Sequence, residues 1–148
     1  DEKELYIRLN NYAKEYKKNI NKESEKNLIK SIHFLKNKAK SLEDIYNNAQ
    51  YIIAENLIIK EETLKLIDEK AKQIISDFSK RIENGKKLNK ESLEKDLKEL
   101  INIHKTNFKG VGQPMRIALT GSKYGPGIYD IILSLGKEIV LKRLNNLT

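Results

Sequence analysis

The residues best suited to recognise another molecule lie close together near the end of the sequence. Gln113 offers a carboxamide, and Arg116, three positions later, offers a planar guanidinium. A guanidinium donates two parallel hydrogen bonds to a pair of oxygen or nitrogen acceptors, and it also stacks on flat rings. A Gly-Pro-Gly-Ile turn follows over residues 125–128, and we expect it to expose backbone N–H and C=O groups. This combination is suited to binding rather than to making or breaking bonds.

No pattern of residues points to catalysis or to a metal. His33 and His104 lie far apart in the sequence and no cysteine is present, so no metal-ligand spacing exists. No Ser or Thr lies in a nucleophile motif with a plausible base. The 125–127 turn lacks the Lys-Ser/Thr ending of a phosphate-binding loop, and Pro126 has no N–H to donate. We therefore predict no catalytic residue, no metal site and no cofactor in this chain.

The charge of the chain is consistent with a nucleic-acid partner without establishing one. Lys and Arg number 29 against 21 Asp and Glu, which gives a formal net charge of +8. Most of the basic residues are Lys, and the chain is rich in Asn and Ile, which resembles the composition bias of an AT-rich genome. The basic residues are concentrated over residues 14–40 and 106–148, on either side of a balanced centre. This distribution favours binding to RNA.

Apolar residues recur at helical spacing through most of the chain, and no alternating strand pattern occurs. The pattern predicts an all-α fold, with a first helix over residues 2–18 and a second that Asn21 caps and whose apolar stripe ends at Ala39. A third helix follows a cap at Ser41. A long fourth helix is expected from Glu61 to Asn84, with Gly85 ending it in a left-handed conformation. A fifth is expected after a cap at Asn89.

The stretch with the candidate binding residues is expected to form shorter helices. Pro114 suits the first turn of a helix, where its missing N–H has no effect, and Gly121 suits the end. The sequence therefore predicts a helix over 114–120, a tight loop over 122–127, a helix over 128–135 and a last helix after Gly136. We expect two small subdomains: a helical connecting subdomain over 1–59, and a helical cage over 60–148.

The order of motifs in the last forty residues resembles the C-terminal, anticodon-binding region of bacterial glutamyl-tRNA synthetases, which are class I aminoacyl-tRNA synthetases. The matching pieces are Gln113-Pro114-Met115-Arg116, Ala118-Leu119-Thr120-Gly121, Gly125-Pro126-Gly127-Ile128, Leu135-Gly136-Lys137-Glu138 and Arg143-Leu144. Met115 replaces the usual Leu of that family, and Tyr129 replaces a frequent Phe. Weaker similarity covers residues 35–42, with Lys38 where the family usually has Arg and Ser41 where it usually has Thr.

The resemblance implies that this chain recognises the anticodon loop of tRNA-Glu. The residues that the resemblance assigns to the anticodon are Arg116, Gln113, Gly125, Pro126, Ile128 and Lys38. Lys123 and Arg143 are expected to contact phosphates. Each of the anticodon assignments has a structural alternative. Arg116 could be a solvated or salt-bridged helix residue, and Gln113 could cap a helix. Residues 125–128 could form a structural turn with Ile128 in the core, and Lys38 could be one more surface lysine. Tyr124 could stack on a base, whereas the ring of Tyr129 is expected to pack beside Ile132.

The ATP-binding motifs of the family, of the His-x-Gly-His and Lys-Met-Ser-Lys-Ser types, do not occur. The chain therefore resembles a fragment of a longer enzyme, whose catalytic domain, ATP and Mg lie elsewhere. We expect a cytoplasmic monomer without a secretory signal or a membrane span, because no run of about 18 apolar residues exists. A basic helical adaptor that binds proteins through an apolar groove is the alternative. Whether tRNA-Gln is also accepted stays open.

Overall fold

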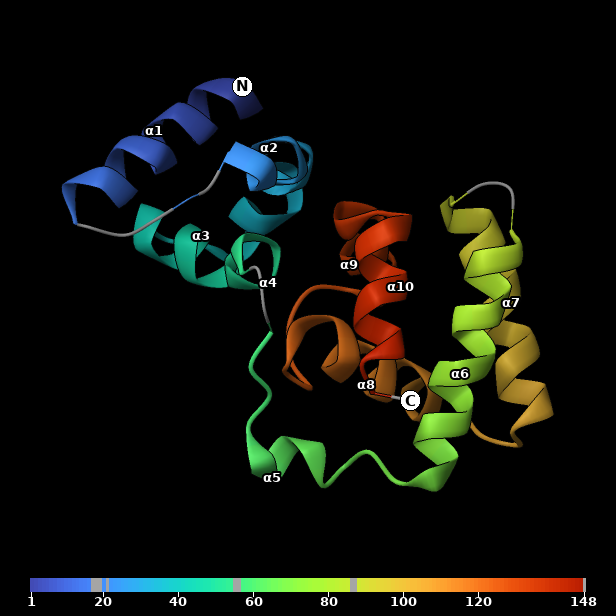
Figure 1. The fold of residues 1–148 in the computed structure, drawn as a ribbon. Coiled ribbons are helices and arrows are strands. Elements are labelled where there is room, and N and C mark those ends of the chain that lie inside the picture. Colours follow the sequence, from blue (N-terminus) through green and yellow to red (C-terminus); the bar gives the residue numbers. More distant parts are fainter. Residues whose placement is uncertain (17–19, 21, 55–56, 86–87, 148) are drawn as a thin grey trace. The chain divides into compact units, whose positions relative to one another are not determined.

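The structure is a computed structural model, and it describes the chain apart from residues 17–19, 21, 55–56, 86–87 and 148. The described residues form helices and no strands, which confirms the predicted all-α fold (Figure 1). They divide into two compact units, residues 1–56 and residues 57–148, where we expected a division between 59 and 60. Among the residues described, no helix has the length and apolar character that crossing a membrane requires.

The described residues of the first unit form four α-helices and one short 3-10 helix. These are α1 (Glu2–Glu15), α2 (Lys22–Leu35), η1 (Lys36–Lys38), α3 (Leu42–Asn48) and α4 (Gln50–Ile53). Helix α1 packs on both α2 and α3. Leu9, Leu28 and Ile32 are fully buried in the core that these helices share. The Ser24 hydroxyl donates a hydrogen bond of 3.2 Å to the Ile52 carbonyl, which joins α2 to α4.

Several predicted helix ends in this unit differ from the structure. Helix α1 ends at Glu15 rather than near residue 18, and the expected cap at Asn21 lies outside the described residues. Ala39 follows η1 with an extended backbone, so it is not part of the α2 stripe. Ser41 does cap α3, because its hydroxyl accepts the Asp44 N–H at 3.1 Å. The helix after this cap is interrupted at Ala49, where α3 gives way to α4.

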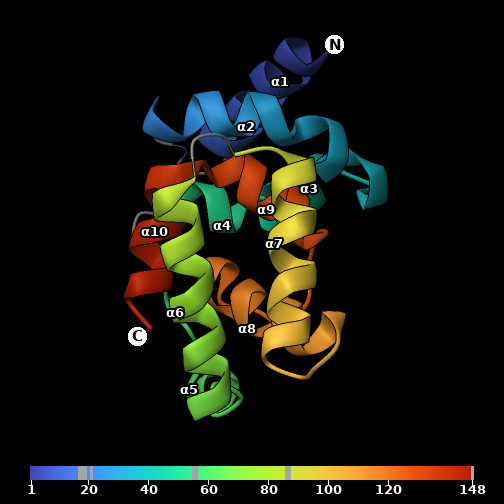
Figure 2. The same ribbon diagram turned by 90° about the vertical axis from the view of Figure 1, so that its right-hand side faces the viewer.

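The second unit is arranged around α8 (Phe108–Thr120). The other helices are α5 (Glu61–Leu64), α6 (Glu69–Asn84), α7 (Lys90–Ile103), α9 (Ile128–Leu135) and α10 (Lys137–Asn145). Helix α8 contacts α6, α7, α9 and α10, and Figure 2 shows α6 and α7 side by side with α8 inclined to both. Met115, Ile117 and Leu119 of α8 are fully buried and form the centre of the core. The most central helix of this unit therefore also contains Gln113 and Arg116.

The predicted long helix over 61–84 is wrong, because the structure has two helices there. The Asp68 carboxylate accepts the Ala71 N–H at 2.8 Å and starts α6 at residue 69. Leu64 consequently belongs to α5 and is 39% exposed. Gly85 does follow α6, but its backbone is extended (φ −76°) and not left-handed. Lys137 Nζ donates to the carbonyls of Glu83 and Gly85 at 3.3 and 3.2 Å, and so supplies donors to the end of α6.

The helix with the candidate residues begins six positions before the predicted start. The Asn107 side chain accepts the Gly110 N–H at 2.8 Å, so α8 starts at Phe108 and Pro114 lies inside it. Two glycines in the first turns have low helix propensity and obscured this start in the sequence. The predicted end is confirmed: Gly121 has φ 81° and caps the helix. The predicted helix over 128–135 and its separation from α10 at Gly136 are confirmed as well.

Candidate nucleic-acid interface

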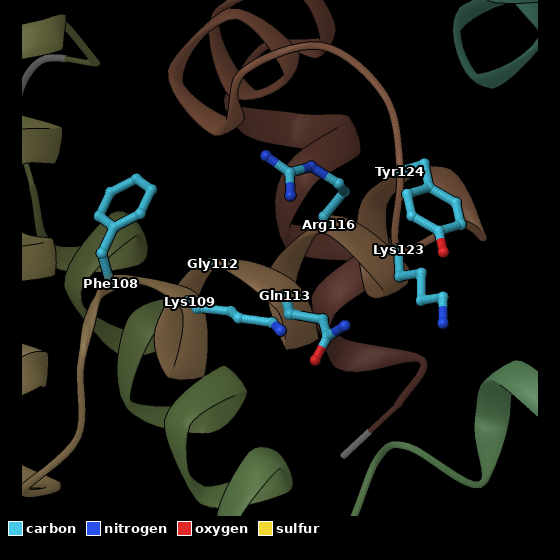
Figure 3. Close-up of a pocket in the computed structure, with 7 residues that line it drawn as sticks. All are labelled: Phe108, Lys109, Gly112, Gln113, Arg116, Lys123 and Tyr124. Atoms are coloured by element: carbon cyan, nitrogen blue, oxygen red, sulfur yellow. The ribbon is translucent and has the colours of Figure 1, made fainter.

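One face of α8 and the loop after it enclose a hollow of about 270 Å³ (Figure 3). Residues 108, 112 and 116 are spaced four apart, so they lie along one face of the helix. The loop that follows Gly121 adds the side chains of Lys123 and Tyr124. The residues that line the hollow are Phe108, Lys109, Gly112, Gln113, Arg116, Lys123 and Tyr124. The structure thus brings together Gln113, Arg116 and Lys123 of the residues that the sequence selected.

Arg116 lies between the two ends of the hollow and has unused hydrogen-bonding capacity. Its Nε atom is shielded from solvent and has no hydrogen-bond partner among the described residues. No ion pair joins its guanidinium to a carboxylate in the described part of the chain. The Thr120 hydroxyl donates to the Arg116 carbonyl at 2.8 Å, an extra bond on the backbone of this turn. An unpaired buried donor is costly in a folded protein, and such cases often coincide with function.

The lining of the hollow is cationic. Lys109 and Lys123 are exposed, and no acidic residue is among the lining residues. Lys123 Nζ lies 5.2 Å from the centre of the Tyr124 ring, within the range of a cation–π contact. Two side-chain hydrogen bonds, from the Ser122 N–H to Thr120 Oγ1 and from the Tyr124 N–H to Ser122 Oγ, hold the loop, each at 3.1 Å. Positive charge and hydrogen-bond donors in this arrangement suit an anionic, flat molecule.

Aromatic rings stand at both ends of the hollow. Tyr124 is 73% exposed and Phe108 is 48% exposed. The Phe108 ring lies 6.3 Å from the ring of Tyr129, with the planes tilted by 54°. Burial raises the pKa of Tyr129 above its usual value, and the charge of Glu94 adds to this shift. The Tyr129 ring is therefore partly buried behind Phe108.

Three of the residues that the resemblance assigned to the anticodon, Gly125, Pro126 and Ile128, are not among the lining residues of this hollow. Gly125 is exposed with φ 139°, and Pro126 beside it is half-buried. Ile128 is 1% exposed and belongs to the core of the unit. Lys38 lies in η1 of the first unit, and its side chain is outside the described part. The assignment of these four residues to an anticodon stays a prediction.

Arg143 is buried rather than surface-exposed. Only 7% of it is exposed, and its Nη1 donates a hydrogen bond of 2.6 Å to the carbonyl of Leu119. This bond links α10 to the last turn of α8. Its burial and its bond to a backbone carbonyl favour a structural role, and the assignment of Arg143 to a phosphate contact stays a prediction.

Sequence reasoning missed Phe108, Lys109 and Gly112 as lining residues. They were overlooked because the helix was expected to start at Pro114, which left them in a loop without a defined face. Phe108, Gly112 and Arg116 are spaced four residues apart, and this spacing places these three residues on one side of a longer helix.

The described residues contain no group of three or more His, Cys, Asp or Glu side chains that could hold a metal ion. His104 is engaged with Asp77, at 2.7 Å between Nε2 and the carboxylate. Arg81 of α6 pairs with Asp96, at 3.4 Å, and with Glu99, both on α7. These charged groups connect α6 and α7 and do not form part of the hollow.

Comparison with known proteins agrees with this geometry. A glutamate–tRNA ligase from Pelagibacter ubique is 54% identical over 146 residues, which cover 99% of this chain and 31% of that protein. Glutamate–tRNA ligase 1 from Orientia tsutsugamushi is 33% identical over 120 residues, or 80% of this chain and 25% of that protein. The chain thus spans a third or less of the length of these relatives.

Solved structures show the same fold. A glutamate tRNA ligase from Elizabethkingia meningosepticum superposes with a TM-score of 0.79 over 99% of this chain and 28% of that chain, at 19% sequence identity. The family described as anticodon binding domain matches residues 4–148, nearly the whole sequence. The chain belongs to this family of anticodon-binding domains.

Proposed function

We propose that this chain binds the anticodon loop of tRNA-Glu, with the hollow on α8 as part of the contact surface. Proteins recognise RNA sequence mainly in single-stranded loops, whose bases are splayed, stacked on aromatic rings and hydrogen-bonded at their edges. The observation that supports the proposal most is the unpaired guanidinium of Arg116 beside Gln113, in a hollow flanked by Lys109 and Lys123. Arginine and carboxamide donors suit base edges, and lysines suit phosphates.

The proposed parent protein is a glutamate–tRNA ligase, to which this chain supplies the part that recognises the tRNA. The similarity to such ligases supports this role, and so do the five sequence motifs. ATP and Mg²⁺ would act in the catalytic domain of the parent. The hollow does not fit Mg²⁺, since its lining contains no carboxylate. The residues of this chain would position the tRNA and take no part in the bond-making steps.

The first test compares RNA hairpins that share one stem. The loop of one hairpin contains a glutamate anticodon, and the loop of the other contains the same bases in scrambled order. Fluorescence anisotropy with the full chain should show tighter binding to the glutamate loop. The logarithm of the association constant should fall with the logarithm of salt concentration, by about 0.7 for each phosphate contacted. Equal binding to the two loops would reject sequence recognition by this chain.

A basic protein-binding adaptor was the alternative, and the family match does not favour it. The same titration separates the two functions. An adaptor would bind both hairpins weakly and with the same salt dependence, because only its net charge would act on the RNA.

A further inference from the structure

We propose that Phe108 and Gly112 together form a seat for one unpaired RNA base, with Lys109 beside it to contact the adjacent phosphate. The inference rests on the proposed function and adds residues that neither the motifs nor the resemblance assigned. The seat lies at the end of the hollow opposite Tyr124 (Figure 3). It would bind a flat ring by stacking, whereas Arg116 and Gln113 would bind the edge of a base.

Phe108 is a large apolar side chain that the fold leaves half exposed. The residue is 48% exposed, although it starts the most central helix of its unit. The ring is nevertheless supported from behind by Tyr129, at 6.3 Å between ring centres. A supported ring loses little conformational freedom when another ring stacks on it, and base stacking on aromatic side chains is the common mode for single-stranded nucleic acids.

Gly112 has no steric reason to be glycine. It lies inside α8, where glycine is less favourable than alanine by about 1 kcal/mol. A Cβ atom built on it would meet only Phe108 Cε1, at 3.8 Å, which is an ordinary contact. Gly110, two residues earlier, differs: a Cβ there would clash with the Thr106 hydroxyl. The Thr106 side chain therefore disfavours a Cβ at 110. At the buried Gly112, a methyl group would make one ordinary contact with the Phe108 ring and fill space in the hollow.

Lys109 completes the seat. It lines the same hollow, with its side chain directed along α8 towards Gln113 (Figure 3), and no ion pair engages it within the described part of the chain. A base that stacks on Phe108 would bring its phosphate close to this part of the helix, where an unpaired ammonium attracts it without sequence preference.

The decisive variant is Gly112→Ala, because the seat and the fold predict opposite effects. Alanine should raise the melting temperature through its better helix propensity, and the same methyl group should weaken hairpin binding by filling the seat. Phe108→Leu removes the ring and should weaken binding between about fivefold and 100-fold, whereas Phe108→Tyr keeps the ring and should bind like the unchanged chain.

Lys109→Ala should weaken binding and lower the salt dependence. Lys80→Ala is the charge-matched control on α6, exposed and outside the hollow.

Binding is measured by anisotropy with the glutamate-anticodon hairpin, and stacking by the fluorescence of 2-aminopurine placed at successive loop positions. One position should be quenched by the unchanged chain and by Phe108→Tyr, and less by Phe108→Leu and Gly112→Ala. If the unchanged chain prefers the glutamate loop but Gly112→Ala binds it equally well, the seat is wrong and the proposed function stands. If Gly112→Ala lowers both stability and binding, the glycine is structural and the seat is also wrong. If the unchanged chain shows no preference between loops, the proposed function itself fails.

Discussion

Arg116 combines a fixed backbone with a side chain whose Nε finds no hydrogen-bond partner in the described part of the chain. Pro114, two residues before Arg116, restricts the backbone of this turn of α8. The Thr120 hydroxyl donates a hydrogen bond of 2.8 Å to the Arg116 carbonyl. Its Nε has no acceptor among the described residues. A guanidinium held in this way can donate two parallel hydrogen bonds to a base edge, whereas a lysine could offer only a point charge. Shape, and not charge alone, should therefore decide what Arg116 recognises.

We predict that Arg116→Lys loses base discrimination while keeping electrostatic attraction. By analogy with bidentate base contacts in DNA, the loss should be roughly 1–3 kcal/mol at one anticodon position. The salt dependence of binding should hardly change, because the charge is conserved. Binding to a set of hairpins that differ at single loop bases measures both quantities. Equal weakening for every hairpin would instead make Arg116 a structural or phosphate-contacting residue.

The elements that position the site depend on local caps and on the pairing of α6 with α7. Asn107 caps the start of α8, the turn that contains Phe108 and Lys109. Arg81 joins α6 to two carboxylates of α7, and its hydrogen bond holds the pKa of Glu99 below the ordinary value of 4.5. Both features are local, so single substitutions can test each of them.

Asn107→Ala should destabilise the chain by about 0.5–2 kcal/mol, because the Gly110 N–H loses its acceptor. Asn107→Ser, which keeps a capping oxygen, should recover most of the loss. Urea unfolding measures the stability of the three proteins. Since the cap fixes the first turn of α8, hairpin binding by the alanine variant should weaken as well. Unchanged stability in Asn107→Ala would show that solvent replaces the cap.

The lowered pKa of Glu99 makes part of the stability depend on pH. A carboxyl group whose pKa is lower in the folded state stabilises the fold above its unfolded pKa, and the contribution disappears as pH falls through the folded value. The melting temperature of the unchanged chain should therefore exceed that of Glu99→Gln at neutral pH, and the gap should close on acidification below about 4.5. Glu83→Gln is the control, because Glu83 is an exposed residue of α6 without a charge partner among the residues described. A gap that persists at low pH would contradict the role of the charge. The effect should be small, because the Glu99 side chain is 42% exposed.

At the scale of the whole molecule, the chain belongs to a family of anticodon-binding domains and corresponds to one part of longer relatives. The nucleotide-binding motifs of the synthetases do not occur in its sequence, and its relatives are three or more times longer. The two units that the structure describes are helical, and each has its own core. The module should therefore fold without the rest of a synthetase.

We predict that the chain alone unfolds cooperatively with a helical circular dichroism spectrum and catalyses no glutamate-dependent ATP–pyrophosphate exchange. The physical reason is that binding residues without a nucleotide site can position an RNA but cannot activate glutamate. Thermal melts followed at a helical wavelength, together with an exchange assay, measure these properties. Exchange activity above that of a heat-denatured control would disprove the second expectation.

The sequence predicted what depends on single residues with strong backbone preferences. Gly121 and Gly136 marked the end of α8 and the boundary between α9 and α10, and Ser41 and Asn89 marked two caps. It failed where two signals competed. Asp68 interrupts a continuous apolar stripe, and the cap at Asn107 outweighs two glycines. That second error hid Phe108, Lys109 and Gly112, so the sequence identified only the C-terminal half of the hollow.

The hydrogen bond from Arg143 to the Leu119 carbonyl also has a consequence for how this family can evolve. The acceptor is a backbone atom, which every amino acid provides, whereas the donor must be a long side chain that reaches it from α10. The hydrogen bond therefore restricts the amino acid at position 143 but not the one at position 119. Across species, position 119 should vary among apolar residues of similar volume, while position 143 should keep a basic side chain whatever its distant neighbour becomes.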